Sequence, residues 1–551
     1  MKKLIFLLSL SMGFSTELNL SRFEPGIREN GRIRVWIYFQ DKANLVAPVL
    51  SQRQKNNRLR AGRSTEANWY DIALSEVYLN QIEAMDIDIL RESKWLNAVS
   101  VLVNQSELLA LNELSFVKKL SPIHRMARPK LKRTSQPIFL NMSREDTLAY
   151  GYAQAQIEQI NVHTAHENGY YGQGVRILVM DTGFDLTHTA FDSLNLIAQR
   201  DFINNDDFTG NETDSEFATG QDSHGTAVLS SMASYYPDSL IGPAFKSEIL
   251  LAKTEMVAEE IQGEEDNYVA GLEWGEANGA QVVSTSLGYL DWYTYDDMDG
   301  NTAVTTNAID IAAGLGLSCV TAAGNEGYNS WYYIIAPADA DSVIAVGAVD
   351  VNDNIAYFSS YGPTSDGRIK PEICARGVNT WAVEPGTDTF DTYSGTSLAT
   401  PLVGGAVAVI LSAHPDWSPM QIREALMMTA DHQANPDNHY GYGIIDTWGA
   451  INYSTVSTDK ETVAQHISVL KTYPNPFNPS ATIRFSVEKG FITSLHIYDI
   501  NGRMVETLID GIVESGIHEI QWNAGNQASG IYFVRLESGD VFETQKIVLM
   551  K

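Results

Sequence analysis

The stretch VRILVMDTGFD (175–185) decides the fold of the central part of this chain. Its first residues are almost all apolar and the run ends at Asp181, a pattern typical of a strand that is buried on both faces. Three further apolar runs end in small or polar residues in the same way: AQVVSTSLG (280–288), GLSCVTAAGN (316–325) and SVIAVGAVD (342–350). Because helix-like segments separate these runs, we expect an α/β domain with a doubly wound parallel sheet over residues 150–452.

The region before this sheet, residues 16–130, alternates strand-like and helix-like segments, which predicts a small α+β domain. Its strand-like segments are RIRVWIYF (32–39), NAVSVLVN (97–104) and SFVKKLSPI (115–123). Its helix-like segments are a stretch near 65–85 and QSELLALNEL (105–114).

The region after the sheet begins with a polar stretch, residues 453–470, which is typical of a linker. Residues 471–551 then alternate apolar and polar residues with period two, and Asn-Gly, Ser-Gly and Gly-Asp pairs punctuate the runs. Period-two alternation with such turn signals predicts an all-β sandwich.

The first fifteen residues, MKKLIFLLSLSMGFS, predict a secretory signal peptide over 1–15. Two lysines give a positive start, the apolar stretch 4–10 is too short to span a bilayer, and Gly13 and Ser15 form a small-residue cleavage site. No later apolar run reaches the length of a membrane helix. We therefore expect an exported protein, secreted or at the cell surface, with no transmembrane segment.

The charge of the chain is unevenly distributed. The net charge of −30 argues against nucleic-acid binding, because a phosphate backbone would repel such a surface. Residues 1–135 carry 21 Lys and Arg against 13 Asp and Glu, a balance of +8, which leaves 17 against 55, or −38, for residues 136–551. Two interpretations stay open: a basic front piece that binds an acidic body, or two domains that merely differ in charge.

Three side chains with matched chemistry stand in separate segments. Asp181 ends a buried strand, His224 begins the helix-like stretch HGTAVLSSMAS, and Ser397 lies within SGTSLATP, just ahead of an apolar helix-like run. Each segment alone could be a turn or a helix cap, since Ser, Thr and Asp cap helices. Their occurrence together at strand ends and helix starts favours catalysis, because the working residues of such sheets gather at one edge.

The proposed chemistry needs these residue types. A serine hydroxyl is a poor nucleophile at neutral pH, and a neutral imidazole can take its proton and return it to the leaving group. A buried carboxylate fixes the imidazole tautomer and stabilises the imidazolium. The negative charge that develops on the substrate oxygen needs a donor already in place, and Asn325 at the end of CVTAAGN is the candidate for this oxyanion hole.

The helix after Ser397 carries three residues with expected structural roles. We place Pro401 in its first turn, where a missing N–H does least harm. Gly404 and Gly405 would let the helix lie close against its neighbours.

These segments resemble the subtilisin-like serine proteases, peptidase family S8. The matching segments, in the family's order, are DTGFD (181–185), HGTAV (224–228), STSLG (284–288), AAGNEG (322–327), FSSYGP (358–363), KPEICARG (370–377), SGTSLATP (394–401) and GYGIID (441–446). The resemblance implies a secreted serine endopeptidase that acts through an acyl-enzyme. It also implies a parallel sheet between helices, the subtilisin-like fold.

The resemblance implies a role for each matched residue. Asp181 would orient the imidazole, His224 would be general base and acid, Ser397 the nucleophile and Asn325 the oxyanion donor. The segment Ser286, Leu287 and Gly288 would be the edge on which an extended peptide substrate lies as an added strand. The alternative is a secreted, non-catalytic binding protein that kept the fold.

The flanking regions also resemble known parts of such proteins. Residues 16–130 resemble an inhibitor-like propeptide, which would make the protein a self-processed zymogen cut between about 121 and 150. Residues 471–551, from YPNPFNP to QKIVLMK, resemble the C-terminal sorting domains of type IX secretion, through which the protein would contact secretion machinery. The alternative for this tail is an ordinary immunoglobulin-like accessory domain.

Three further features stay open. The acidic stretch 201–222 can hold structural calcium through carboxylate and carbonyl oxygens or can be a solvated loop, and no metal ligand can be named. Cys319 and Cys374 form either a disulfide or two buried thiols. The aromatic stretch DWYTYDDMDG (291–300) either walls the substrate cleft or is a surface loop. The chemistry itself requires no cofactor.

Overall fold

The computed structural model describes residues 20, 23, 30–42, 46–123, 132–133, 148–257, 264–290, 293–454, 468–475, 477–487, 491–500, 503–513, 516–538 and 541–551. The expected signal peptide and most of the expected linker and processing span lie outside these residues. The chain divides into two compact units, Met1–Thr455 and Val456–Lys551.

The centre of the first unit is a seven-stranded sheet in which every neighbouring pair is parallel. Its strands, in chain order, are β6 (Arg176–Asp181), β7 (Asn195–Asp201), β10 (Glu248–Lys253), β11 (Val282–Thr285), β12 (Ser318–Ala322), β13 (Val343–Val349) and β14 (Ile373–Arg376). They lie in the order β14-β13-β12-β11-β6-β10-β7, which confirms the expected doubly wound parallel sheet. The strand order reverses between β6 and β11, and such a switch point is where open α/β sheets bind ligands.

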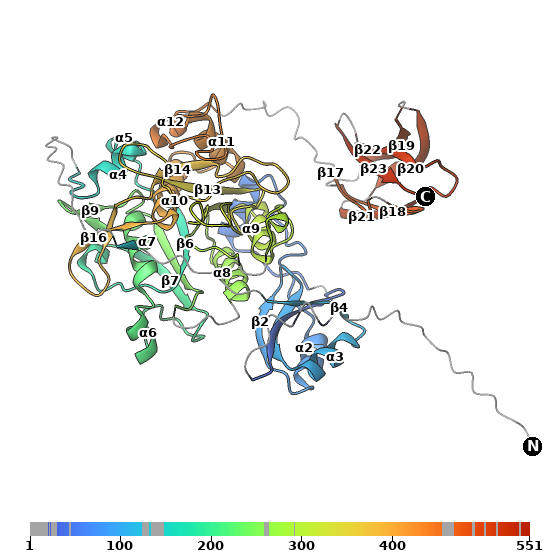
Figure 1. Ribbon diagram of the computed structural model, residues 1–551, viewed down its shortest axis with the longest axis horizontal. Helices are drawn as coiled ribbons and strands as arrows, with labels where there is room; N and C mark the ends of the chain where they lie inside the picture. The colour runs from blue at the N-terminus through green and yellow to red at the C-terminus, as the bar shows by residue number, and fades with distance from the viewer. Residues whose placement is uncertain are drawn as a thin grey trace, which may run out of the picture. The chain divides into compact units, whose positions relative to one another are not determined.

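Helices cover both faces of this sheet (Figure 1). They are α4 (Gln154–Gln159), α5 (Val162–Glu167), α6 (Asp214–Thr219), α7 (Ser223–Ala233), α8 (Glu264–Ala277), α9 (Val304–Gly314), α10 (Thr396–Ala413), α11 (Pro419–Thr429) and α12 (Thr447–Ile451). Alternate residues of β6 face opposite layers: Ile177 belongs to the core with α7 and α10, and Leu178 to the core with α8 and α9. Burial on both faces explains why the strands read as unbroken apolar runs.

The central helix α10 packs directly on the sheet. A Cβ at Gly404 would lie 2.9 Å from the Ser284 hydroxyl oxygen on β11, so the predicted close approach is confirmed. Among the described residues, α10 alone has the length and composition to cross a membrane, and 89% of it is buried inside the domain. The expectation that no apolar run reaches this length is therefore wrong for α10, which is a core helix.

The N-terminal region forms a small α+β domain, as expected. Its antiparallel sheet has the order β2-β3-β1-β4. The elements are β1 (Ile33–Phe39), α1 (Gln52–Arg60), α2 (Glu76–Glu83), β2 (Ile89–Ser93), β3 (Ala98–Val103), α3 (Gln105–Asn112) and β4 (Val117–Pro122). The helix expected near 65–85 is wrong in extent, since only α2 is helical there and residues 61–75 form turns and loop.

Short strands complete the first unit. These are β5 (Lys132–Arg133), β8 (Tyr235–Tyr236), β9 (Leu240–Ile241), β15 (Thr380–Val383) and β16 (Phe390–Ser394). β16 pairs with β15 on one side and with β5 on the other, and it leads directly into α10. The chain therefore reaches Ser397 from a paired strand rather than from a free loop.

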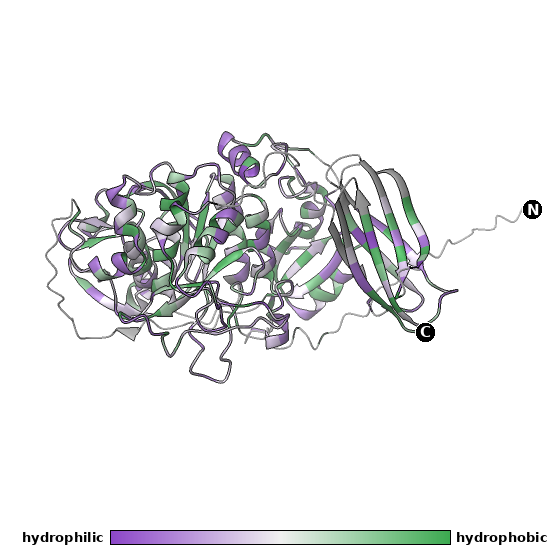
Figure 2. Cartoon of the chain, turned by 90° about the horizontal axis from the view of Figure 1, so that it is seen from above, coloured by the Kyte–Doolittle hydropathy of each residue, from purple (hydrophilic) through white to green (hydrophobic). Residues whose placement is uncertain are grey.

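The second unit contains two antiparallel sheets over a single described core. The sheets have the orders β17-β18-β21 and β20-β19-β22-β23. Their strands are β17 (Ser468–Tyr473), β18 (Ser480–Val487), β19 (Phe491–Asp499), β20 (Met504–Val513), β21 (Gly516–Asn523), β22 (Gly530–Ser538) and β23 (Val541–Leu549). Hydrophilic and hydrophobic residues alternate along them (Figure 2), as a sandwich with one buried face per sheet requires.

Candidate active site

Asp181 and His224 meet at the carboxyl end of β6. Asp181 is fully buried, and its Oδ1 accepts a hydrogen bond from the backbone N–H of Thr182 at 2.7 Å. His224 Nδ1 lies 2.6 Å from the same oxygen. A proton on Nδ1 is therefore held by the carboxylate, which leaves Nε2 as the nitrogen able to accept a proton.

The second residue of helix α7 is His224, and the next residue lets the helix come close to Asp181. A Cβ at Gly225 would lie 2.1 Å from the Gly183 carbonyl oxygen and 3.0 Å from the Asp181 Cβ. Any side chain at this position would push the helix away from the strand end. The glycine in HGTAV therefore allows the close packing that brings the His224 imidazole beside the Asp181 carboxylate.

Ser397 is the second residue of α10, and its backbone is held by Ser286. Pro401 is the sixth residue of the helix, so the prediction that it lies in the first turn is wrong. Because proline has no N–H, it cannot donate to the Ser397 carbonyl four residues earlier. The Ser286 hydroxyl donates to that carbonyl instead, at 2.9 Å, and the Ser397 Oγ lies 3.5 Å from the Ser286 carbonyl oxygen.

Asn325 follows β12 and lies beside Ser397. Its Oδ1 accepts hydrogen bonds from the Thr396 backbone N–H at 2.9 Å and from the Thr396 hydroxyl at 3.1 Å. These bonds orient the amide so that Nδ2 remains a donor. Asn325 Nδ2 and Ser397 Oγ each lie 3.7 Å from the point where a Cβ on Gly395 would stand, so donor and hydroxyl border the same space.

The structure thus places the expected catalytic and oxyanion residues in two hydrogen-bonded groups. Asp181 is bonded to His224, and Ser397 is linked to Ser286 and lies beside Asn325. Within the described ranges, no hydrogen bond connects Ser397 with His224. Catalytic hydrogen bonds are often long without substrate and tighten when it binds.

The segment from Ser286 to Gly288 continues β11 beyond its last paired residue. All three residues are buried, and Tyr289 next to them donates its N–H to the Ala336 carbonyl at 2.7 Å. In the part of the chain that is described, the backbone groups of Leu287 and Gly288 make no hydrogen bond. They can therefore pair with an added strand.

The acidic stretch 201–222 is not simply a solvated loop. Oxygen atoms of Asp201, Asp206 and Glu212 lie within 4.8 Å of one another, which is close enough to share a cation. The buried Lys253 ammonium, however, pairs with Asp201 at 2.8 Å and with Glu216 at 2.5 Å. A side chain of the protein already neutralises the innermost carboxylates.

The two cysteines are free buried thiols on β12 and β14. Burial raises the pKa of both Cys319 and Cys374, so they are poor nucleophiles. Of the aromatic stretch 291–300, Tyr293 and Met298 pack inward, whereas Thr294 and Asp296 are exposed. The Tyr293 hydroxyl donates to Glu265 at 2.6 Å, and Tyr293 itself packs against the α8–α9 core.

The N-terminal α+β domain lies against the layer of α8 and α9. The Arg34 guanidinium pairs with the buried Asp266 at 2.6 Å, and the Ser100 hydroxyl donates to the same carboxylate. Glu273 on α8 accepts hydrogen bonds from the Ser93 hydroxyl at 2.6 Å and from the Trp95 backbone N–H at 3.1 Å. Carboxylates of α8 therefore receive donors from the sheet of the N-terminal domain.

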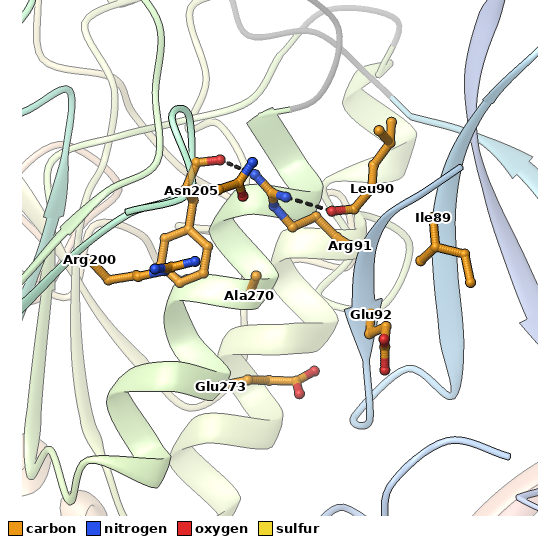
Figure 3. Close-up of a pocket in the computed structure, with 9 residues that line it drawn as sticks. Ile89, Leu90, Arg91, Glu92, Arg200, Asn205, Ala270 and Glu273 are labelled. Atoms are coloured by element: carbon orange, nitrogen blue, oxygen red, sulfur yellow. Dashed lines mark hydrogen bonds between the residues drawn. The ribbon is translucent and has the colours of Figure 1, made fainter. Parts of the chain in front are cut away.

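A pocket of about 310 Å³ lies at this contact and away from the expected catalytic residues. Figure 3 shows Ala270 and Glu273 on α8 opposite Arg91 and Glu92 from β2. Arg91 crosses the gap, since its guanidinium donates to Asn267 Oδ1 at 2.8 Å and to the Phe202 carbonyl oxygen. The pocket is a space between two docked surfaces.

Helix α1 binds a different surface, at the amino ends of the central strands. Arg53 pairs with Glu248 at the start of β10 at 2.8 Å, and the Arg60 guanidinium donates to the Gly316 carbonyl before β12 at 2.8 Å. Between them, the fully buried Arg58 pairs with Asp71 at 2.7 Å and with Glu276 at 2.9 Å. The N-terminal domain therefore contacts the sheet domain both along α8 and at the amino ends of the central strands.

Comparison with known proteins gives three matches along the chain. The Subtilase family profile matches residues 172–443, the Peptidase S8 propeptide domain of Bacteroidota matches 34–137, and the Secretion system C-terminal sorting domain matches 471–550. Subtilisin NAT of Bacillus subtilis subsp. natto is 34% identical over 313 residues, which is 56% of this chain and 74% of that protein. Subtilisin DY of Bacillus licheniformis is 32% identical over 306 residues, 55% of this chain and 98% of that protein. An alkaline protease of Shouchella clausii is 29% identical over 376 residues, 68% of this chain and 84% of that protein.

Proposed function

This chain belongs to the subtilase family and is a protease of that family, and we propose that it is a serine endopeptidase whose nucleophile is Ser397. Asp181 and His224 complete the catalytic group, and Asn325 is the oxyanion donor. The observation that carries the proposal is the 2.6 Å contact of His224 Nδ1 with a buried carboxylate, at the same sheet edge as Ser397. The non-catalytic alternative is not favoured, because every residue type that the chemistry needs is present.

The first step is the attack of Ser397 Oγ on the carbonyl carbon of the scissile peptide bond. His224 Nε2 takes the hydroxyl proton, and the Asp181 carboxylate stabilises the imidazolium. The C–N bond then breaks, His224 returns the proton to the leaving amine, and an acyl-enzyme remains. Water then attacks the acyl carbon while His224 takes its proton. The ester C–O bond breaks, His224 returns the proton to Ser397 Oγ, and the second product leaves as the carboxylic acid.

Negative charge on the carbonyl oxygen is met by two donors. Asn325 Nδ2 is free to donate because Oδ1 is occupied by Thr396. The Ser397 backbone N–H at the start of α10 is the second donor, where the helix dipole also favours a negative charge. These side chains and backbone groups supply every proton and charge, so the proposed steps are complete without a cofactor.

Calcium binding is typical of the family. Within the described ranges, Asp201, Asp206 and Glu212 form a group that can hold a cation. Because Lys253 already pairs with Asp201, we assign no ion to this group.

The N-terminal region is an S8 propeptide domain, and the protein carries a type IX secretion sorting tail that makes it a secreted or cell-surface protein. We propose that the propeptide is an intramolecular inhibitor that the enzyme removes by a cut between about 121 and 150. The contacts at Asp266, Glu273 and Glu276 support tight docking. The sorting tail would contact the secretion machinery.

The test is the Ser397→Ala variant of the full chain. We expect it to fold and to be exported but to remain uncut, with no hydrolysis of casein or of quenched peptides. Hydrolysis by the purified variant would refute the assignment. A Ser412→Ala variant, changed at a serine on the same helix far from the strand end, is the matched control and should be processed normally.

A further inference from the structure

The side chain of Ile335 fills the space between Gly288 and Gly324, two glycines in the segments that lie beside Ser397. A Cβ at Gly288 would lie 2.3 Å from Ile335 Cδ1 and 2.7 Å from its Cγ1. A Cβ at Gly324 would lie 3.0 Å from Ile335 Cγ1 and 3.2 Å from its Cδ1, with the Ser360 hydroxyl oxygen at 2.7 Å. The ethyl arm of Ile335 therefore lies against the backbones of two segments, one following β11 and one following β12.

The position of Ile335 is fixed by backbone hydrogen bonds to these same segments. Its N–H donates to the Ala323 carbonyl at 3.2 Å, and the carbonyl of the next residue, Ala336, accepts from Tyr289 at 2.7 Å. The side chain is 2% exposed. The backbone bonds fix where the side chain starts, and burial leaves little space into which it could rotate.

The same two segments border the reacting carbonyl. Ser397 Oγ lies 3.5 Å from the Ser286 carbonyl oxygen, and Asn325 Nδ2 borders the space next to this hydroxyl. We consider a substrate whose main chain pairs with Leu287 and Gly288 and whose scissile carbonyl oxygen reaches Asn325. The Cα of the residue that carries this carbonyl then lies between the two segments. The side chain of that residue must enter the space between the two glycines.

We propose that Ile335 makes this space shallow, so that the enzyme cleaves after glycine, alanine or serine and rejects leucine, phenylalanine and longer residues. This inference rests on the proposed function and adds the substrate class. Glycine on both walls would leave room for a large side chain, and Ile335 occupies that room. A buried aliphatic side chain cannot be displaced by a substrate group of similar size without a steric penalty.

The first test needs no variant. The mature wild-type enzyme is used to digest a peptide library, and the cut sites are read by mass spectrometry. We expect a small residue directly before nearly all cuts. For two matched peptides, kcat/KM should be about 100-fold higher with alanine at that position than with leucine. Equal cleavage after leucine would overturn the inference and leave the proposed function standing.

The second test uses Ile335→Ala, which removes three carbon atoms, the number by which leucine exceeds alanine. The leucine-to-alanine ratio of kcat/KM should rise by at least about tenfold, since each methylene in such a pocket changes discrimination by roughly that factor. Ile334→Ala is the control, because Ile334 is equally buried but packs against Ala323, Ala338 and Ala345 on another side. An unchanged ratio in Ile335→Ala, or an equal rise in Ile334→Ala, would contradict the role of Ile335.

Rates in all three proteins are normalised to the fraction of Ser397 that reacts with a fluorophosphonate. This labelling separates the two proposals. Wild-type protein that neither reacts at Ser397 nor cuts any library peptide would refute the proposed function. Labelled, active protein with no preference for small residues would refute only the inference about Ile335.

Discussion

The contact between Glu273 and the propeptide predicts that propeptide binding weakens as pH rises. Glu273 is buried on α8 and accepts hydrogen bonds from Ser93, Lys94 and Trp95, all on the propeptide. Burial raises the pKa of this carboxyl from 4.5 to about 7, against the opposing effect of these hydrogen bonds. A raised pKa means that the complex prefers the protonated acid.

The sign and size of the effect follow from this shift. Release of the propeptide removes Ser93, Lys94 and Trp95 from Glu273, so we expect this carboxyl to be exposed to water in the separated enzyme and its pKa to fall toward 4.5. Association therefore takes up a proton between pH 4.5 and about 7, so binding is tightest below this window and weakens as pH rises through it. The affinity of the propeptide should fall by about tenfold per pH unit, or by roughly two orders of magnitude between pH 4.5 and about 7.

The assay measures propeptide release from the processed protein after its active serine has been blocked with a fluorophosphonate. The dissociation constant is determined at several values between pH 5 and 8, for wild type and for Glu273→Gln. The amide cannot ionise, and like the protonated acid it keeps one oxygen that accepts from the Ser93 hydroxyl and the Trp95 N–H. The difference in pH dependence between the two proteins therefore isolates the ionisation of Glu273. Glu424→Gln, an exposed carboxylate on α11 that bonds Tyr453, is the control. Identical pH slopes for wild type and Glu273→Gln would refute the reasoning.

Two further predictions concern oxyanion stabilisation and propeptide docking. Asn325→Ala should lower kcat by about two to three orders of magnitude, a figure taken from a homologous protease, with little change in KM; normal turnover would exclude Asn325 from the oxyanion hole. Arg58→Met should leave the buried carboxylates of Asp71 and Glu276 unpaired, which costs about 3–5 kcal/mol. The yield of processed protein should therefore fall sharply, and normal maturation would show that the α1 contact is dispensable.

The parallel sheet was predictable because its strands are buried on both faces and therefore read as unbroken apolar runs. Strand ends then located Asp181 and Asn325 without knowledge of the structure. Pro401 lies beyond the first turn that the sequence predicts for it, because α10 begins at Thr396 and no residue pattern marks that start. The hydroxyl of Ser286 that compensates for the missing N–H comes from a segment more than a hundred residues away.

Two features had no usable sequence signal. Helix α1, QRQKNNRLR, contains a single apolar residue, Leu59, so it has no apolar stripe to detect, and its contacts are ion pairs and hydrogen bonds with distant residues. Ile335 lies in the apolar stretch YYIIAPA, where periodicity gives no reason to single it out. Its significance comes from two glycines on other segments, which only the fold brings beside it.

The central claim is that the Ser397 hydroxyl forms the covalent bond to substrate. A fluorophosphonate mimics the acylation step and leaves a stable adduct on the attacking oxygen. We expect tandem mass spectrometry of the inhibited enzyme to locate one adduct, on Ser397, with its occupancy rising in step with the loss of peptide hydrolysis. An inhibited enzyme with unmodified Ser397, or with the adduct on another residue, would contradict the account.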